Sequence, residues 1–229
     1  MGLKQSNTWV AIALLLVTLV GCSRSNVSAH KGSTKPELQP DVVAAVSKGY
    51  VVTLKALLDT GLVDVNAVDK SGDTLLSNAE NLEMLEFLLA AGADPNVGKP
   101  VLINAAQGGS SEAIAALIKH GAKINCSDAQ GVTPLLAAVG SPVKTEVVRL
   151  LLDSGADANA KIKDDGYTAL MITCRNYSGE VGVQIVRSLL EHGANVNATN
   201  SAGETVLSVC RQQYRREPMC EILMSAGAH

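Results

Sequence analysis

The side chains with the clearest chemistry in this 229-residue chain are its five cysteines. A cysteine thiolate is a strong nucleophile that can take an acyl-bearing group or be oxidised to a disulfide. Cys22 differs from the others because it closely follows an apolar run from Trp9 to Val20, interrupted only by Thr18. That run is too short to cross a bilayer core of about 30 Å, and its length is typical of the hydrophobic region of a signal peptide.

The residues around Cys22 resemble the lipobox of bacterial lipoproteins. Lys4 precedes the apolar run, which ends in Leu19-Val20-Gly21-Cys22. The resemblance implies that a signal peptide, residues 1–21, is removed and that Cys22 becomes the acylated first residue. Several acyl chains anchor a protein stably, because each buried methylene contributes about 0.8 kcal/mol. Ser23 in place of Asp implies the outer membrane, although the inner membrane stays open. The alternatives are an uncleaved anchor, or an ordinary secretory signal with an incidental cysteine.

Residues 22–39 predict a lipidated cysteine followed by a flexible tether. This segment is rich in Ser, Lys, Gly and Pro and nearly free of large apolar residues. It therefore cannot bury enough surface to offset the entropy lost on ordering. We expect the tether to give reach to a folded body at residues 40–229.

The remaining cysteines leave two alternatives open. An exported chain meets an oxidising compartment, where four thiols allow three pairings. Cys210 and Cys220 fall on facing helices expected in one repeat, so a disulfide between them is one interpretation. The other is that they are buried thiols that pack like alanine. The four cysteines concerned are Cys126, Cys174, Cys210 and Cys220.

The sequence shows no motif of an enzyme or a metal site. Residues 93–100 approach a phosphate-binding loop, but Pro100 stands where that pattern requires a hydroxyl. His120 and His192 each precede a Gly at an expected helix C-terminus, where a partly positive imidazole suits the helix dipole. The chain contains no HExxH and no G-x-S-x-G. We therefore expect no catalytic residue, no metal and no cofactor.

The composition favours closely packed helices. The chain is 47% hydrophobic and 18% charged, but only 3% aromatic. Sandwiches and barrels favour β-branched and aromatic residues, and disordered chains are poor in apolar ones. The net charge of -3 argues against nucleic acid as a partner, because phosphate binding requires a basic face.

A Gly-Ala pair recurs along the chain at intervals of 29, 34, 38 and 34 residues. Each pair follows a Leu-rich stretch, and glycine ends a helix by adopting the left-handed conformation. Short polar turns with Asn follow, such as Asp157-Ala158-Asn159. Later units open like Gly131-Val132-Thr133-Pro134-Leu135, in which Thr caps a helix and Pro takes its first position. The pairs are Gly92-Ala93, Gly121-Ala122, Gly155-Ala156, Gly193-Ala194 and Gly227-Ala228.

This combination of period, caps and turns resembles the ankyrin repeat. The resemblance implies an all-α repeat solenoid, built from helix-turn-helix pairs with β-hairpin loops. The second and third units are short, so we expect trimmed first helices or inter-helix turns there. In the fifth unit we expect residues 176–182 to be inserted between the helices, and the end units should act as caps. The six units are 40–68, 69–97, 98–126, 127–160, 161–198 and 199–229.

Ankyrin proteins bind other proteins with hairpin tips and first helices, so the resemblance implies a partner site there. The hairpin at residues 161–167 stands out because it is long, mixed in charge and ends in Tyr167. Tyr and Arg are frequent binding hot spots. A solvated loop or a soluble cap explains any one of these residues equally well. The candidate contact residues are Asp128, Gln130, Lys161, Lys163, Asp164, Asp165, Tyr167, Met171, Arg175, Asn200, Glu204, Arg211 and Tyr214.

The lipobox and the repeats together predict a lipid-anchored, periplasm-facing protein-binding module. Small bacterial lipoproteins with such repeats often resemble immunity proteins, which block a secreted toxin of the kind delivered by type VI secretion. A phospholipase effector suits a membrane-tethered inhibitor, because tether and target share one surface. This step rests on association rather than on any residue. The alternative is an envelope scaffold or an assembly partner of a periplasmic enzyme.

Overall fold

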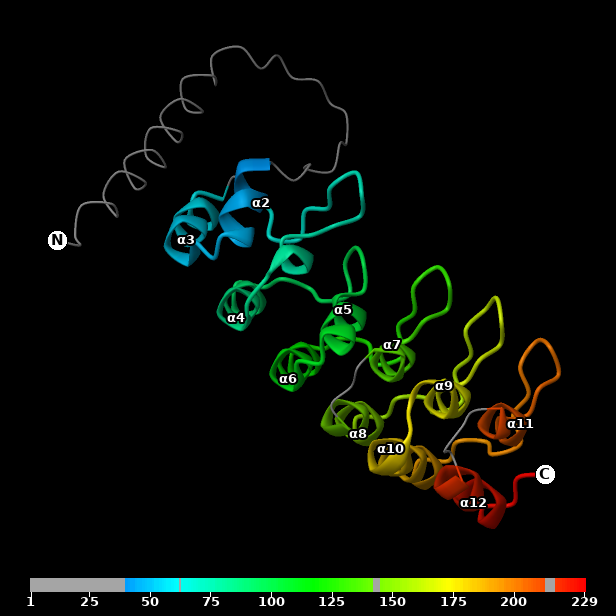
Figure 1. Ribbon diagram of the computed structural model, residues 1–229. Helices are drawn as coiled ribbons and strands as arrows, with labels where there is room; N and C mark the ends of the chain where they lie inside the picture. Colours follow the sequence, from blue (N-terminus) through cyan, green and yellow to red (C-terminus); the bar gives the residue numbers. More distant parts are fainter. Residues whose placement is uncertain (1–39, 62, 142–144, 213–216) are drawn as a thin grey trace. The chain divides into compact units, whose positions relative to one another are not determined.

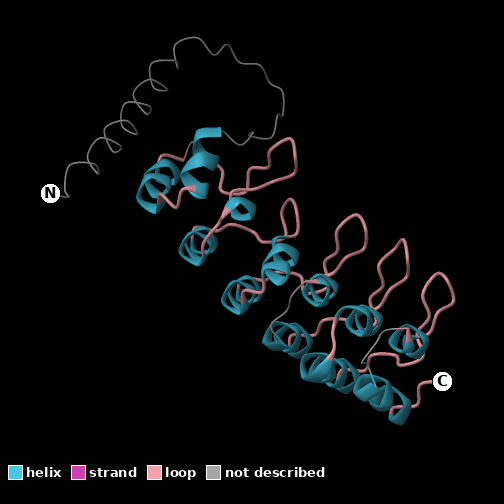
Figure 2. Cartoon of the chain, viewed as in Figure 1, coloured by secondary structure: helices cyan, strands magenta, loops and turns pink. Residues whose placement is uncertain are grey.

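The structure of the protein is a computed structural model that describes residues 40–61, 63–141, 145–212 and 217–229. These residues form two compact units that divide after Lys99. Both units consist of helices, turns and projecting loops, and no strand occurs in the described part of the chain (Figure 2). The predicted signal peptide, Cys22, the tether and Tyr214 lie outside the described residues.

The first unit contains helices of two repeats, and the second of these repeats is trimmed as predicted. Its first helix is reduced to a single 3₁₀ turn, because side chains compete with the helical backbone for the carbonyl of Thr74. The Ser77 hydroxyl and the Asn78 amide donate to that carbonyl at 2.9 and 2.8 Å. The helices of this unit are α2 (Pro40–Ser47), α3 (Val51–Asp59), η2 (Leu76–Asn78) and α4 (Leu82–Ala90).

The second unit stacks helix pairs in two rows (Figure 1). We call α5, α7, α9 and α11 the first helices, and α6, α8, α10 and α12 the second helices. Apolar side chains between the rows form the core, and Leu151, Leu170 and Leu189 are at most 1% exposed. The bounds are α5 (Val101–Gly108), α6 (Ser111–Lys119), α7 (Pro134–Gly140), α8 (Thr145–Asp153), α9 (Ala169–Asn176), α10 (Gly179–Glu191), α11 (Val206–Arg211) and α12 (Glu217–Ser225).

Threonines begin three of the first helices, as the sequence predicts. The side chains of Thr133, Thr168 and Thr205 each accept a hydrogen bond from a backbone amide in the first turn. Such caps stabilise a helix by about 1 kcal/mol each. Pro134 takes the first position of α7, where a proline loses no hydrogen bond. These caps fix where each hairpin ends and each first helix begins.

Asparagines in several of the polar turns join one repeat to the next. Asn159 donates to the carbonyl of Gly193 at 2.9 Å and accepts from the amide of Asn195 at 2.7 Å. Asn125 makes the same pair of bonds one repeat earlier, with Gly155 and Asp157. From the sequence, these asparagines were predicted only to lie in turns. They pair backbone groups in the turn that follows the second helix of the next repeat.

The insertion expected between the helices of the fifth repeat lies elsewhere. Only Tyr177 and Ser178 separate α9 from α10, and the other extra residues lengthen α10 to 13 residues. The Tyr177 hydroxyl donates to the carbonyl of Ser141, which fixes the turn. A Cβ atom on Gly182 would lie 2.5 Å from the Met219 sulfur, so glycine lets α12 approach this added helical turn.

The third repeat keeps a first helix of 8 residues, α5. Its shortening lies instead in the loop before the helix. That loop spans residues 91–100, whereas the loop before α7 in the next repeat spans residues 120–133. Neither form of trimming that the sequence left open is found here, since both α5 and its turn are as long as α9 and the turn of the fifth repeat.

Candidate protein-binding surface

Side chains inside the hairpins shape the tips. The Asp128 carboxylate accepts hydrogen bonds from the amides of Gln130 and Val132 at 3.0 and 2.9 Å. The Asn200 side-chain oxygen accepts in the same way from Ala202 and Glu204, at 3.0 and 2.9 Å. Asp and Asn favour such turns because their short side chains reach the backbone two residues on. Asp128 and Asn200 therefore hold the loops rather than project from them.

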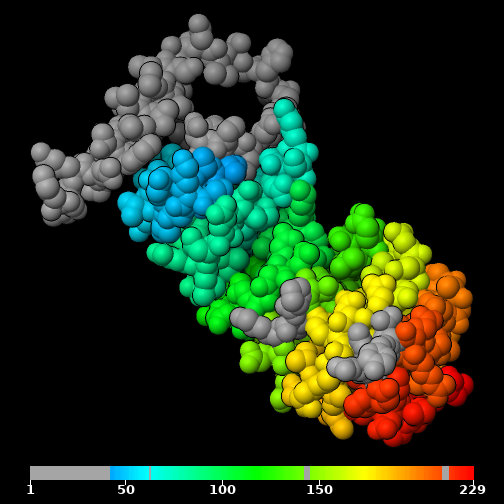
Figure 3. Space-filling model, in the orientation of Figure 1, coloured from blue at the N-terminus to red at the C-terminus, as the bar shows by residue number. Residues whose placement is uncertain are grey.

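Neighbouring hairpins of the second unit are joined through their backbones. The amide of Lys163 donates to the carbonyl of Gln130 at 3.0 Å, and that of Ser201 donates to Asp165 at 2.9 Å. Gly166 has a φ of 71°, and a Cβ atom there would lie 2.9 Å from the Ser201 amide nitrogen. The tips consequently run side by side along one edge of this unit (Figure 3).

Two exposed lysines extend from the 161–167 hairpin in opposite directions. Lys163 donates to the carbonyl of Ala129 in the preceding hairpin at 3.2 Å. Lys161 donates to the carbonyl of Thr199 in the following hairpin at 2.8 Å. A groove of about 480 Å³ lies between the 161–167 hairpin and the hairpin that follows it. It is lined by Lys161, Ile162, Lys163, Gly166, Thr199, Asn200 and Ser201. Asp164, also exposed, lies at the tip beside it.

An aromatic side chain beside the hairpins links two repeats. The guanidinium carbon of Arg175 lies 4.6 Å from the centroid of the Tyr167 ring. The Tyr167 hydroxyl donates to the Glu204 carboxylate at 3.4 Å. Glu204 also accepts from the amides of Gln212 and Asn200, at 2.8 and 2.7 Å. We call Tyr167, Arg175, Asn200, Glu204 and Gln212 the Tyr167 cluster.

Hydrogen bonds favour the ionised form of Glu204. They hold the pKa of this carboxyl below its usual value, with the Gln212 amide as the largest cause and the Asn200 amide as the next. Burial acts in the opposite direction, and the bond from Tyr167 adds the smallest lowering effect. Glu204 is thus a negatively charged acceptor held in place by Gln212, Asn200 and Tyr167.

Comparison with known proteins identifies the repeats. Family models described as ankyrin repeats match residues 42–89, 76–162 and 144–229. The chain belongs to the ankyrin-repeat family. The predicted fold class is thereby confirmed, and ankyrin repeats are typically scaffolds for protein–protein interaction.

Relatives and solved structures show how far the ankyrin similarity extends. Putative ankyrin repeat protein YahD of Escherichia coli (strain K12) is 27% identical over 199 residues, covering 83% of this chain and 98% of YahD. Ankyrin repeat protein nuc-2 of Neurospora crassa is 32% identical over 165 residues, covering 68% of this chain but 15% of nuc-2. The chain likewise spans only 20% and 6% of the length of two other relatives, from rice and Caenorhabditis elegans.

A solved ankyrin repeat domain from Acinetobacter baumannii has the same arrangement of helices. It superposes with a TM-score of 0.74 at 27% identity, covering 82% of this chain and 98% of that one. The similarity therefore extends over nearly the whole of a compact bacterial ankyrin domain. It concerns the fold and the interaction scaffold, and the comparisons name no partner for this chain.

The prediction that Met171 contacts a partner is wrong. Met171 is 0% exposed, because it holds the position of Leu136 in the preceding ankyrin repeat, and both side chains are core residues. Asn200 is 8% exposed and is held by Glu204, so it too is a poor contact residue. In contrast, Gln130, Lys161, Lys163, Asp164 and Arg175 are exposed, and Asp165, Tyr167 and Glu204 are partly exposed.

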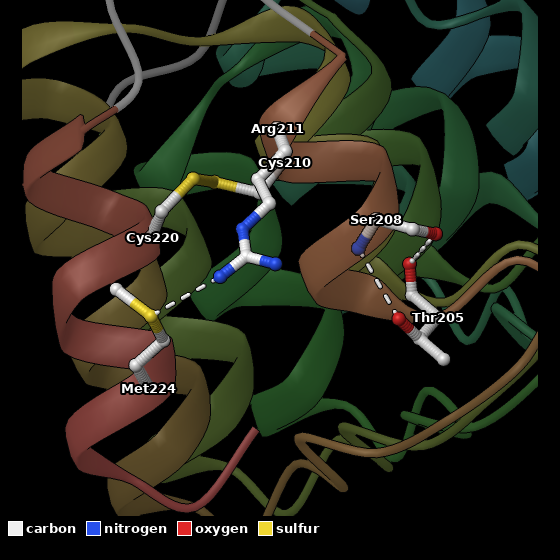
Figure 4. Close-up of a disulfide and its surroundings, with 6 residues drawn as sticks. All are labelled: Thr205, Ser208, Cys210, Arg211, Cys220 and Met224. Atoms are coloured by element: carbon white, nitrogen blue, oxygen red, sulfur yellow. Dashed lines mark hydrogen bonds between the residues drawn. A yellow bond between two sulfur atoms is a disulfide. The ribbon is translucent and has the colours of Figure 1, made fainter. Parts of the chain in front are cut away.

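Arg211 does not join the Tyr167 cluster. Counted from the capping threonine, Arg211 holds the position of Val139 and Cys174, which are buried in inner ankyrin repeats. In the last repeat this position is exposed, and the guanidinium lies 3.4 Å from the Met224 sulfur (Figure 4). Arg211 thus lies on the exposed surface of the sixth repeat, away from the Tyr167 cluster. Gln212 was not among the predicted contact residues. It directly follows α11, and its side-chain amide donates to Glu204.

The described residues contain neither a cluster of metal ligands nor a helix that could span a membrane. In residues 40–61, 63–141, 145–212 and 217–229, no three His, Cys, Asp or Glu side chains gather so that they could hold a metal ion. Within the same part of the chain, no helix combines the length and the apolar character needed to cross a membrane. His120 and His192 lie at the C-termini of α6 and α10, as the sequence predicts.

Proposed function

We propose that this ankyrin protein is a lipid-anchored, periplasm-facing immunity protein that binds a secreted antibacterial toxin. The observation that carries the binding step is the stacking of exposed Arg175 on Tyr167, whose hydroxyl is tied to Glu204. Side chains ordered before binding lose less entropy when a partner arrives. Tyr and Arg are also the residue types that most often dominate binding energies. The hairpin tips beside the cluster supply a polar rim.

The choice of a toxin as partner rests on the predicted address and on the fold. A lipobox at Leu19-Val20-Gly21-Cys22 supports attachment to a bacterial membrane. A phospholipase effector acts at that same surface, so an anchored inhibitor meets it at a raised local concentration. Blocking such an enzyme requires only a binding surface, which ankyrin repeats provide.

The anchor is tested by fractionation and labelling. We expect the wild-type chain in the membrane fraction and labelled by a fatty acid supplied to growing bacteria. Cys22→Ala should lose the label and leave that fraction, since the acyl chains attach to Cys22. Cys126→Ala, which removes a thiol in the second unit, is the matched control and should keep both. Labelled Cys22→Ala would contradict the lipobox assignment.

The immunity function is tested by sensitivity and binding. If a neighbouring gene encodes a secreted phospholipase, deletion of this gene should make cells sensitive to sister cells that deliver it. The purified full chain should bind that effector and block its lipase activity. Arg175→Glu should weaken binding. Arg187→Glu makes an equal charge change at an exposed position of α10, and it should not weaken binding. Undiminished resistance in the deletion strain, with no effector gene nearby, would contradict the proposal.

A further inference from the structure

A disulfide closes the last repeat. Cys210 near the end of α11 is joined to Cys220 in α12, with Cα atoms 6.0 Å apart and a sequence separation of 10 (Figure 4). Cys210 is 0% exposed and Cys220 is 8% exposed. The bond therefore crosses the interior of one helix pair rather than its surface.

In the described part of the chain, the sixth repeat packs against another repeat on one side only. In the second unit, α9 packs against first helices on both sides, α7 and α11. By comparison, α11 packs against α9 and its own partner helix α12, and it is only 6 residues long. In repeat proteins each unit is stabilised mainly by its nearest neighbours, so a unit that packs against one neighbour opens more easily than one that packs against two. A covalent link between its two helices restricts that opening.

The same repeat completes the Tyr167 cluster. Glu204 directly precedes the capping Thr205 of α11, and Gln212 directly follows the helix. Glu204 is the acceptor of the Tyr167 hydroxyl, and Gln212 holds that acceptor in place by donating to it. The Ser201 amide, in the hairpin of this repeat, also donates to the Asp165 carbonyl. Opening of α11 and α12 consequently removes two of the links that order the preceding hairpin.

We propose that the Cys210–Cys220 disulfide is a redox-sensitive lock on the last repeat and, through it, on the Tyr167 cluster. Its formation removes two protons and two electrons from the two thiols. The electrons pass to a disulfide-bearing oxidant, which is reduced to two thiols, and a dithiol reductant reverses the step. The lock closes only outside a reducing compartment. The link to binding rests on the proposed function, whereas the lock itself does not.

Hydrogen exchange of the full chain tests the lock without a partner. We expect reduction by dithiothreitol to speed the exchange of amides in α11 and α12 by about tenfold or more, while α7 and α8 stay unchanged. Reoxidation with glutathione disulfide should restore the slow rates. Cys210→Ala/Cys220→Ala should behave as the reduced protein with or without reductant. Cys174→Ala removes a buried thiol one repeat earlier, and it should remain sensitive to reduction. Equal rates before and after reduction would overturn the lock.

The coupling to the Tyr167 cluster has its own readout in the same experiment. Peptides covering residues 161–168 should exchange faster after reduction, because Ser201 and Glu204 no longer hold that hairpin. Acceleration confined to α11 and α12 would overturn the coupling. Absence of toxin binding by the oxidised protein would instead refute the proposed function, and it would leave the exchange result as it stands.

Discussion

Arg175 and Tyr167 form a stacked pair, with the guanidinium carbon 4.6 Å from the centroid of the ring. Tyr167 ends the hairpin of the fifth repeat, and Arg175 lies in the last turn of α9, the helix that follows. A hydrogen bond from the Tyr167 hydroxyl to Glu204 extends the pair into the sixth repeat. An exposed cation is thus held at a defined position on the hairpin side of the second unit.

Removal of the cation from this pair should weaken partner binding. For Arg175→Ala we expect a loss of about 10- to 100-fold in affinity, as is typical of a truncated hot spot. Titration calorimetry with the cognate effector measures the loss. Arg187→Ala on α10 is the matched control and should bind like the wild type. Circular dichroism should be unchanged in both variants, and equal affinities would move the binding site away from the cluster.

The asparagines that join successive repeats should carry a measurable share of stability. Asn159→Ala removes one donor and one acceptor between repeats, so we expect a loss of about 1–3 kcal/mol in the free energy of unfolding. Urea unfolding followed by circular dichroism measures it. Asn104→Ala, on the exposed face of α5, controls for the loss of an amide side chain. A loss no larger than that of the control would contradict this role.

Local signals in the sequence predicted most of the fold. The capping threonines and the glycines that end helices act within a few residues, so their roles follow from the sequence alone. In contrast, the helical conformation of residues 179–182 did not follow from the sequence, because Gly179 and Gly182 lower the helix propensity of this segment. The space at Gly182 is limited by Met219, which belongs to a helix of the next repeat, so it could not be predicted from the local sequence.

The candidate site was harder to predict, because exposure depends on the position of a residue within its repeat. Met171 aligns with the apolar Leu136, and that signal for burial was present in the sequence. Arg211 aligns with buried positions of inner repeats, yet it is exposed in the sixth repeat, where it lies against Met224. The Tyr167 cluster was predicted in part, but Gln212 was missed because its bond to Glu204 depends on how α11 ends beside the hairpin.

The close approach of neighbouring hairpins should make Gly166 intolerant of a side chain. Gly166→Ala places a methyl group 2.9 Å from the Ser201 amide nitrogen and forces a left-handed conformation on alanine, so we expect a loss of about 1–3 kcal/mol. Gly108→Ala is the control, because it adds a methyl group in open space at the end of α5. Thermal unfolding should show a lowered Tm for the first variant only. An unchanged Tm for Gly166→Ala would show that the hairpins separate at little cost.

Acidification should loosen the sixth repeat through Glu204. Hydrogen bonds from Gln212, and then from Asn200 and Tyr167, lower the pKa of Glu204 in the folded protein despite an opposing effect of burial. A group whose folded pKa is lowered stabilises the fold above its unfolded pKa, and that contribution is lost as the pH falls through the folded value.

The variant Glu204→Gln isolates this contribution. We expect the wild type to be more stable than Glu204→Gln at neutral pH. The difference should shrink once the pH drops below the usual value for glutamate, and it should vanish below the lowered folded pKa. Urea unfolding at several pH values measures this difference in stability. Glu191→Gln, at an exposed position of α10, corrects for the change in net charge. A difference between wild type and Glu204→Gln that stays constant down to the lowest pH would contradict the role of the ionised carboxylate.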